Sequence, residues 1–298
     1  MKRFAGTGEP ATKSQHLEEH APTPVSRVEI EYIAPSRSLR PFVTTFFHFS
    51  CDDEEIHDIQ PADVGKLMLV LKGEGTAHFR DGRSQSIPCC SLQSPTGVAL
   101  PFQFTGGFHS CGAALTPLGW AALSGMPADK FGNQIFDAAE ILGPAANQLC
   151  ETMIDLNARP EFTKEAMQGA LTSFVEKHLG RVNARHARLI EVTVEWLGTS
   201  LDPDLEALYA QSGYSRRQTQ RLVERYFGLN PQALRRKYRA VRAAAILSAL
   251  ETDDAQVEAV MEHFYDQSHL IREIGIFVGR TPSRLGGEDK PILNGLLE

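Results

Sequence analysis

The spacing of hydrophobic residues changes along the 298-residue chain. Between residues 28 and 115, short runs of β-branched, aromatic and aliphatic residues alternate with turns, as at 42–47 and 67–71. The Asp81-Gly82 pair between two such runs is typical of a hairpin turn. Several short strands separated by turns predict a β-sandwich or barrel in this part of the chain.

From residue 117 the apolar spacing becomes helical. Two stripes of apolar residues recur at three- and four-residue steps, as residues on one face of a helix do. The first stripe is Leu142, Ala146, Leu149, Met153 and Leu156, and the second is Phe162, Ala166, Ala170 and Phe174. We expect both helices to pack on the β-rich part or on a second copy of the chain.

From residue 184 onward the pattern predicts short helices joined by turns. Asp202 and Pro203 suit an N-cap and a first helical position. A tight turn at 212–215 precedes a helix over 216–227, which Gly228 ends. Asn230 and Pro231 then open a long helix that reaches about residue 250.

Two segments of this helical part share one layout. Residues 213–221 and 264–272 each contain a turn with an aromatic residue, followed by a helix that is polar early and apolar late. Each helix ends in a Gly-x-x-Pro sequence, at 228–231 and at 279–282. The repeat predicts two helix-turn-helix units connected by one long helix.

Charge is unevenly distributed along the chain. The net charge is -7 and the pI is about 5.8, which alone does not suggest a nucleic-acid partner. Residues 212–242, however, contain nine basic side chains and Glu224 as their one acid. A basic segment within an acidic chain is what contact with DNA phosphates requires.

The polar residues early in both repeat helices are suited to reading bases. Arginine bonds guanine and glutamine bonds adenine through two hydrogen bonds in the major groove. The predicted base-reading residues are Arg216, Arg217, Gln218, Gln220 and Arg221 in the first unit, and Gln267, Ser268, His269 and Arg272 in the second. We expect phosphate contacts from Ser215, Arg225, Arg235, Arg236 and Lys237.

In the segments 213–221, 227–231, 265–273 and 279–282, the chain resembles the AraC/XylS family of transcription regulators. The resemblance implies a DNA-binding domain with two recognition helices that enter successive major grooves of double-stranded DNA. The second unit has His263 where the family usually has glycine, and Gly275 lies inside its last helix. We therefore expect the first unit to read sequence and the second mainly to position the domain.

These features predict an α+β protein. The expected parts are a disordered tail (1–26), a cupin-like β-rich sensor or dimerisation domain (27–116), a helical connector (117–183), an all-α AraC-type DNA-binding domain (184–286) and a C-terminal tail (287–298). The β-rich part is similar to the sensor domains of such regulators, which implies a small-molecule effector, a homodimer and contact with RNA polymerase. The expected effector pocket is lined by Phe46, Leu69, Phe79, Phe102 and Phe104.

The alternative is a cupin-type small-molecule-binding protein or a metal-dependent enzyme. A metal site needs three or four converging ligands. The histidines of the β-rich part are scattered and form no His-x-His pair; they are His48, His57, His78 and His109. No nucleophile motif is present, so we expect no enzyme, metal or cofactor. A binding module that has lost DNA contact is a second alternative.

Five cysteines are present, and the adjacent Cys89 and Cys90 are expected to be reduced thiols. The first 24 residues lack the apolar stretch of a signal peptide, and no run of about 18 apolar residues exists. We therefore expect a cytoplasmic protein without a membrane span.

Overall fold

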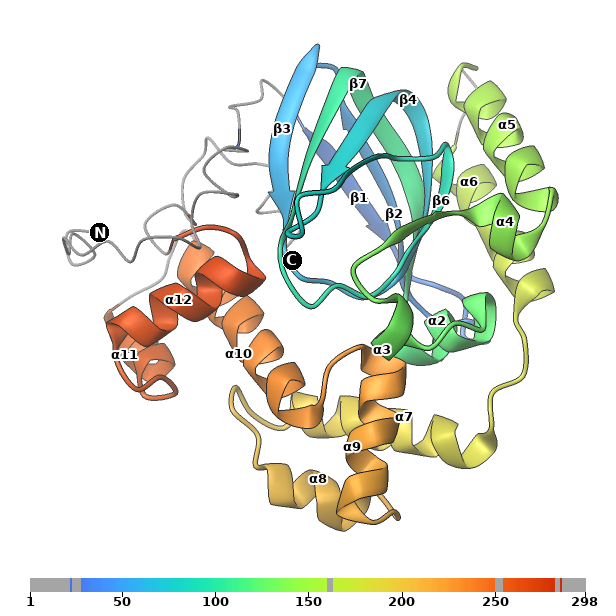
Figure 1. Ribbon diagram of the computed structural model, residues 1–298. Coiled ribbons are helices and arrows are strands. Elements are labelled where there is room, and N and C mark those ends of the chain that lie inside the picture. Colours follow the sequence, from blue (N-terminus) through green and yellow to red (C-terminus); the bar gives the residue numbers. More distant parts are fainter. Residues whose placement is uncertain (1–21, 23–27, 160–162, 250–253, 282–284, 286–298) are drawn as a thin grey trace.

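A computed structural model describes residues 22, 28–159, 163–249, 254–281 and 285 (Figure 1). The two predicted tails therefore lie almost wholly outside the described residues, as do Phe162 of the second helical stripe and Pro282 of the second repeat. No helix in the described part of the chain has the length and apolar character needed to span a bilayer.

The N-terminal part forms one antiparallel sheet of eight strands. The strands are β1 (Glu29–Ile33), β2 (Val43–Cys51), β3 (Glu55–Gln60), β4 (Lys66–His78), β5 (Ser84–Ser86), β6 (Cys90–Gln93), β7 (Leu100–Leu115) and β8 (Ile135–Asp137). Their order is β1-β2-β7-β4-β6-β8, with β3 paired to β7 and β5 paired to β4. This arrangement confirms the predicted β-rich, cupin-like half.

The long strand β7 changes partners near its middle. Its first residues pair with β3 and its last eight pair with β2. Gly106 and Gly107 lie between the two stretches with φ of 76° and 87°, a region that favours glycine. Gly73 of β4 lies opposite, where a Cβ atom would stand 1.9 Å from the Gly107 carbonyl oxygen. Glycine at these positions allows the two longest strands to approach closely where the pairing changes.

Five helices follow β7 or lie beside the sheet: α2 (Pro117–Ser124), α3 (Ala128–Phe131), α4 (Ala138–Leu142), α5 (Ala145–Asn157) and α6 (Lys164–His178). Ala146, Leu149 and Met153 of α5 are buried, as the first apolar stripe predicts. The buried face of α6 is instead formed by Met167, Leu171, Phe174 and Val175, while Ala166 is exposed. Of the second predicted stripe, Phe174 is buried and Ala170 packs against the core, whereas Ala166 does not belong to the buried face.

The five side chains expected to line an effector pocket do not line one cavity. Phe46 and Leu69 belong to the main core with Trp120, whereas Phe102 and Phe104 belong to an aromatic cluster with Phe49 and Phe108. Phe79 lies in a third cluster with Ala77, Leu100 and Ile135. All five are buried and are divided among three apolar clusters, two of which share Ile87 as a neighbour.

A disulfide joins Cys89, just before β6, to Cys150 of α5, with the two Cα atoms 6.5 Å apart. The expectation that Cys89 is a reduced thiol is therefore wrong. The separation of 61 residues left no local signal for this pairing. Cys51, Cys90 and Cys111 are free thiols, and all three are buried.

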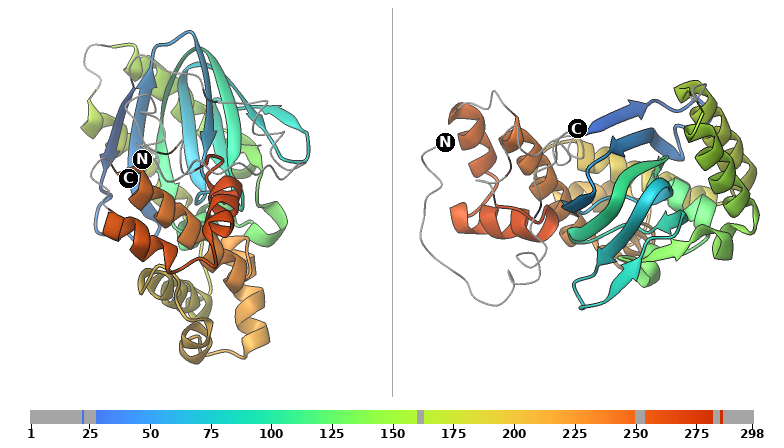
Figure 2. Two further views of the ribbon diagram at one scale, coloured as in Figure 1. Left: turned by 90° about the vertical axis from the view of Figure 1, so that its left-hand side faces the viewer. Right: turned by 90° about the horizontal axis from the view of Figure 1, so that it is seen from above.

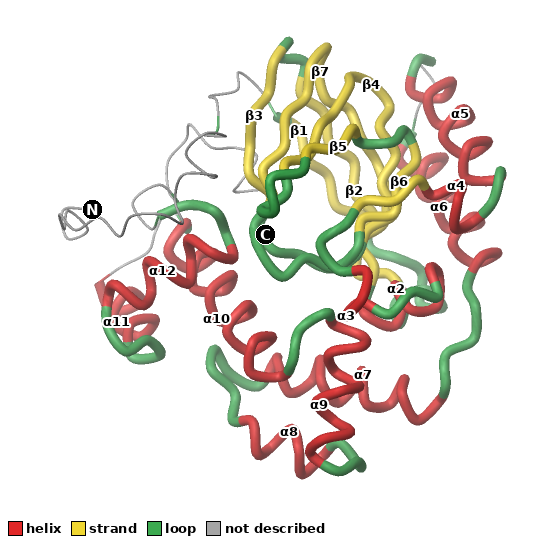
Figure 3. Tube along the Cα trace, in the orientation of Figure 1, coloured by secondary structure: helices red, strands yellow, loops and turns green. Residues whose placement is uncertain are grey.

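The C-terminal part is helical, as predicted. Its helices are α7 (Ala184–Gly198), α8 (Leu205–Gln211), α9 (Arg216–Phe227), α10 (Pro231–Ser248), α11 (Asp254–Met261) and α12 (Gln267–Phe277). Figure 3 shows these helices outside the sheet, and Figure 2 shows α10–α12 across the sheet from α5 and α6. Thus α7–α9 and α11–α12 form two separate groups joined by α10 (Figure 1).

Candidate nucleic-acid interface

The first helix-turn-helix unit consists of α8, a turn and α9. Gly213 has φ of 69° in the turn, and Ser215 is the N-cap of α9. The Ser215 side chain accepts from the Gln218 backbone N–H, while the Gln218 side chain accepts from the Ser215 backbone N–H at 3.3 Å. This capping box satisfies two backbone donors at the helix start. Gln218, predicted to read bases, and Ser215, predicted to contact phosphate, are therefore both engaged in capping.

The two faces of α9 have opposite character. Leu222, Val223, Tyr226 and Phe227 are buried in an apolar core with α7 and α8. Arg217, Gln220 and Arg221 are exposed and border one open hollow on the molecular surface. The core therefore fixes the helix while leaving its polar face accessible, as the base-reading prediction requires.

Three polar residues of α9 contact α8 or the core, the first being Gln220, whose Nε2 donates to the Tyr209 hydroxyl at 3.2 Å. Arg216 pairs with Glu206 at 3.0 Å and its guanidinium lies 4.5 Å from the centre of the Tyr209 ring. Arg225 is exposed near the Tyr226 ring. Arg216 therefore stabilises the packing of the two helices, while Arg225 keeps the solvent position expected of a phosphate contact.

The second unit consists of α11, a turn and α12. Asp266 caps α12 by accepting from the His269 backbone N–H at 2.7 Å. Gln267, Ser268 and Arg272 are exposed. His269 is different, because its Nδ1 contacts the Tyr265 backbone N–H and its Nε2 lies 3.1 Å from Glu273 Oε1. His269, predicted to read bases, is thus engaged inside the domain.

Three basic residues of α10 that were predicted to contact phosphate have partners within the protein. Arg235 pairs with Asp202 at 3.2 Å, and Arg236 pairs with Glu273 at 2.6 Å. Lys237 is 5% exposed and donates to the carbonyl oxygens of Asp63 and Thr96, both at 2.7 Å. The prediction that Lys237 contacts phosphate is therefore wrong, because its ammonium group faces the β-rich half of the protein.

The end of α12 lies against the β-rich half (Figures 1 and 2). The Ile276 and Phe277 carbonyls, which a helix end leaves without internal donors, accept from the backbone N–H groups of Ala99 and Ala62. Just beyond, the buried Arg280 guanidinium forms an ion pair with the buried Asp58 carboxylate and donates to the Ile59 carbonyl. Directional polar contacts therefore join the second unit to the sheet.

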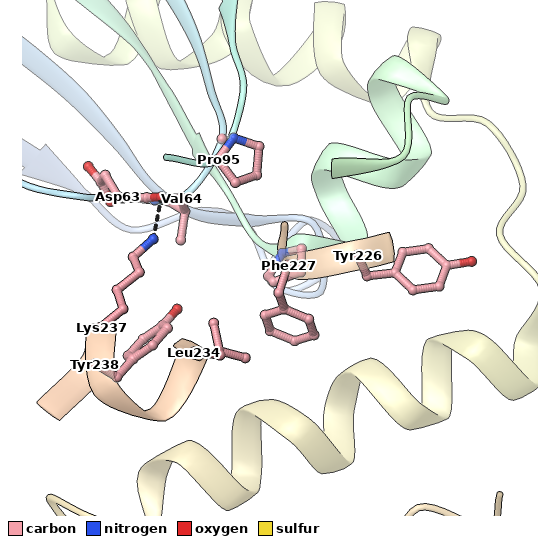
Figure 4. A pocket seen from close by; sticks show the side chains of 10 residues that line it. Asp63, Val64, Pro95, Tyr226, Phe227, Leu234, Lys237 and Tyr238 are labelled. Carbon is pink, nitrogen blue, oxygen red and sulfur yellow. Dashed lines mark hydrogen bonds between the residues drawn. The ribbon is translucent and has the colours of Figure 1, made fainter. Parts of the chain in front are cut away.

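A small cavity lies where α9 and α10 meet the β-rich half, bordered by Lys237 and Tyr238 on one side and Asp63 and Pro95 on the other (Figure 4). Burial lowers the pKa of Lys237 to about 8 and raises the pKa of Tyr238 to about 12. Both shifts disfavour the charged form, as expected for groups removed from water.

The scattered histidines of the β-rich half have individual contacts. His57 lies 2.8 Å from Glu55, His109 lies 2.9 Å from Asp52, and His78 Nδ1 lies 2.9 Å from Ser84 Oγ. Within the described part of the chain, no group of three or more metal-ligating side chains converges.

Sequence reasoning missed four charged residues of this region: Asp58, Arg239, Glu273 and Arg280, all of them buried. One signal was present, because Glu273 shares a helix face with the apolar Leu270, Ile274 and Phe277. A carboxylate on an apolar face must be paired when it is buried. Its neighbour His269 lies four residues away on the same helix, but its two arginine partners lie 34 and 37 residues away and could not be identified from local spacing.

Two units that each present an exposed polar helix define a helix-turn-helix DNA-binding protein. Residues 208–286 match the sequence model of a helix-turn-helix domain family. This domain is of the AraC type, which confirms the predicted resemblance to AraC-family regulators. A comparison with proteins of curated function gives no match.

Several solved structures match this chain at low sequence identity and with TM-scores below 0.5. ToxT from Vibrio cholerae is 10% identical over 87% of this chain and 97% of its own, with a TM-score of 0.45. Unsaturated fatty acid-bound ToxT from Vibrio cholerae strain SCE256 is 11% identical over 86% and 93%, with a TM-score of 0.42. The AraC-like transcriptional activator CuxR is 14% identical over 78% and 90%, with a TM-score of 0.26.

Proposed function

We propose that this protein is a transcription regulator that reads promoter DNA through α9 and α12. The observation that carries the proposal is the exposed face of Arg217, Gln220 and Arg221 on a helix whose opposite face is buried. Arginine and glutamine tips on the early turns of such a helix suit the donor and acceptor pattern of the major groove. The apolar face keeps these side chains in register with one another.

The proposed division of the chain assigns DNA recognition to residues 184–286 and sensing to residues 27–183. The β-rich half contacts the second unit through Asp58, Ala62 and Ala99, so an effector bound to this half would change how α12 is presented. We propose that the protein acts as a cytoplasmic homodimer that binds two half-sites and contacts RNA polymerase. Catalysis forms no part of this function.

The first test is binding of the full-length protein to duplexes selected from a random DNA pool, measured by fluorescence anisotropy at several salt concentrations. We expect binding to weaken steeply with salt, because phosphate contacts release condensed counterions. Arg217→Ala should cost about 1–3 kcal/mol and relax selection at one base pair.

Arg188→Ala is the matched control, because Arg188 is an exposed arginine of α7 that pairs with Glu191. This variant should select the same sequence as the wild type. The proposal would be overturned by a wild-type protein that shows no salt-dependent duplex binding, or by equal effects of Arg217→Ala and Arg188→Ala.

A further inference from the structure

Glu273 is a carboxylate in an apolar environment. Its side chain is fully buried, on the same face of α12 as Leu270, Ile274 and Phe277. An unpaired carboxylate at such a position would be strongly unfavourable. The position of α12 in the fold therefore depends on the groups that pair with the Glu273 carboxylate.

Three cationic or hydrogen-bonding side chains converge on Glu273. Arg236 Nε lies 2.6 Å from Oε1, and Arg239 Nη2 lies 2.8 Å from Oε2. His269 Nε2 also lies 3.1 Å from Oε1. Although burial acts to raise the pKa of Glu273, the two arginines lower it overall, so the carboxylate is ionised. Both carboxylate oxygens are held by α10, which fixes the rotation of α12 about its own axis.

The same helix α10 also holds the segment that leads into the first unit. Arg239 Nη1 lies 3.1 Å from Asp202 Oδ2, and Arg235 Nε lies 3.2 Å from Asp202 Oδ1. Asp202 precedes α8 in the segment that follows α7. Arg239 therefore contacts one acid of the second unit and one acid of the segment that leads into the first unit, and its guanidinium connects the two through α10.

We infer that Glu273 and Arg239 are positioning residues that hold α9 and α12 at a fixed mutual orientation for binding to two successive segments of duplex DNA. The inference rests on the proposed function. Two recognition helices on one protein must match the spacing of two major-groove segments, so their relative placement enters directly into the affinity. Arginines committed to buried acids hold this geometry without contacting phosphate.

This role predicts a signature that differs from that of a DNA-contacting residue. A lost phosphate contact reduces the slope of log affinity against log salt by about one. Loss of a positioning residue weakens binding to a two-part site while leaving the salt slope unchanged. It also weakens the preference for one spacing between the two parts of the site.

The test uses Glu273→Gln in the full-length protein, because glutamine keeps the side-chain shape and removes the charge. Binding is measured to the selected site, to its first half alone and to sites lengthened by one or two base pairs between the halves. We expect about tenfold weaker binding to the intact site, little change on the half-site, and a flatter dependence on spacing. Glu258→Gln, an exposed glutamate of α11, should behave as the wild type.

Arg236→Gln provides a second variant if Glu273→Gln does not fold, because Arg236 is 42% exposed and Arg239 still pairs with Glu273. It should show a smaller loss of affinity with an unchanged salt slope. A slope reduced by about one would identify Arg236 as a phosphate contact and overturn the inference.

The two proposals fail in different ways. A wild-type protein that binds no duplex overturns the proposed function. A wild-type protein that binds, together with a folded Glu273→Gln variant that keeps both its affinity and its spacing preference, overturns the positioning role alone.

Discussion

The two helix-turn-helix units contact the β-rich half of the molecule in different ways. The first unit does so through apolar groups: Leu118 of α2 belongs to the same core as Leu222 and Phe227 of α9. The second unit adds polar contacts to an apolar contact between Phe277 of α12 and Ala62: the buried Arg280–Asp58 ion pair and two backbone hydrogen bonds to the end of α12. The first connection is non-directional, whereas the second also depends on atomic geometry.

This difference indicates which contacts fix the position of each unit. Apolar packing tolerates small shifts, whereas a buried ion pair loses much of its energy when one partner is displaced. The exposed face of the first unit is therefore held by its own core. The position of the second unit depends on the β-rich half, so we expect changes in that half to reach α12 before they reach α9.

The largest effect is expected when the polar connection is broken. Asp58→Ala leaves the Arg280 guanidinium buried without its carboxylate, which should lower the free energy of unfolding by about 3–5 kcal/mol. Urea denaturation followed by circular dichroism measures this loss. Asp52→Ala is the control, because Asp52 forms an exposed pair with Lys72, and its loss should change the free energy of unfolding far less than the loss of Asp58.

Similar losses for Asp58→Ala and Asp52→Ala would contradict a directional connection at the second unit. The charge-reversed pair Asp58→Arg with Arg280→Asp tests the same point independently, because it restores opposite charges at the site. This double variant should recover part of the stability that either single variant loses.

The next effect concerns pH and Lys237, which lies between the two units and the β-rich half. Its pKa is about 8 in the folded chain and 10.5 in the unfolded chain, so the unfolded state binds more protons between these values. The contribution of Lys237 to the free energy of unfolding should therefore rise with pH in this window, by about 2 kcal/mol between about pH 7 and pH 9.5.

The measurement is the difference in unfolding free energy between wild type and Lys237→Met across this pH range. Tyr238, whose pKa is raised to about 12, contributes with the opposite sign above its unfolded pKa. Asp63 and Lys66 also lie near Lys237. All three residues are present in both proteins, so the difference isolates Lys237. A pH-independent difference would show that the Lys237 ammonium is not desolvated by the interface.

The exposed arginines of α9 and α12 allow the contributions of the two units to discrimination between base pairs to be compared directly. Arg217→Ala removes an exposed guanidinium from α9, and Arg272→Ala removes one from α12. Arg217→Ala should reduce discrimination between base pairs by about 1–3 kcal/mol, and Arg272→Ala by less. Selection of binding sites by both variants provides the measurement. A greater loss of discrimination with Arg272→Ala would reverse the proposed roles of the units.

The sequence was informative where a feature depends on neighbouring residues. The bounds of α9 and its stop at Gly228 were predicted correctly, because each depends on residues within a few positions. The exposed position of Arg217 followed from the apolar stripe on the opposite face of the same helix. Local rules therefore identified the candidate base-reading surface.

The sequence was uninformative where a charge has a distant partner. A count of basic residues treated Arg236 and Lys237 as phosphate contacts, but Glu273 follows Arg236 by 37 residues and the Asp63 carbonyl precedes Lys237 by 174. The same limit applies to Cys89, whose partner follows 61 residues later. Charge and thiol content are visible in a sequence, whereas their pairing is a property of the fold.

The smallest effect compares the caps of the two recognition helices. Ser215→Ala removes the side chain that accepts from the Gln218 N–H and should lower the free energy of unfolding by about 1 kcal/mol. Asp266→Ala removes the corresponding cap of α12 at a similar cost in stability. Their effects on DNA binding should differ, because the first turn of α12 is also held through the contact between His269 and Glu273.

Amide hydrogen exchange in the first turns of α9 and α12 measures this difference. Ser215→Ala should accelerate exchange in the first turn of α9 and weaken DNA binding, because Arg217 lies in that turn. Asp266→Ala should accelerate exchange less in α12 and leave affinity closer to that of the wild type. If the two variants accelerated exchange equally, the His269–Glu273 contact would not be restraining α12, and the second recognition helix would depend on its cap as much as the first.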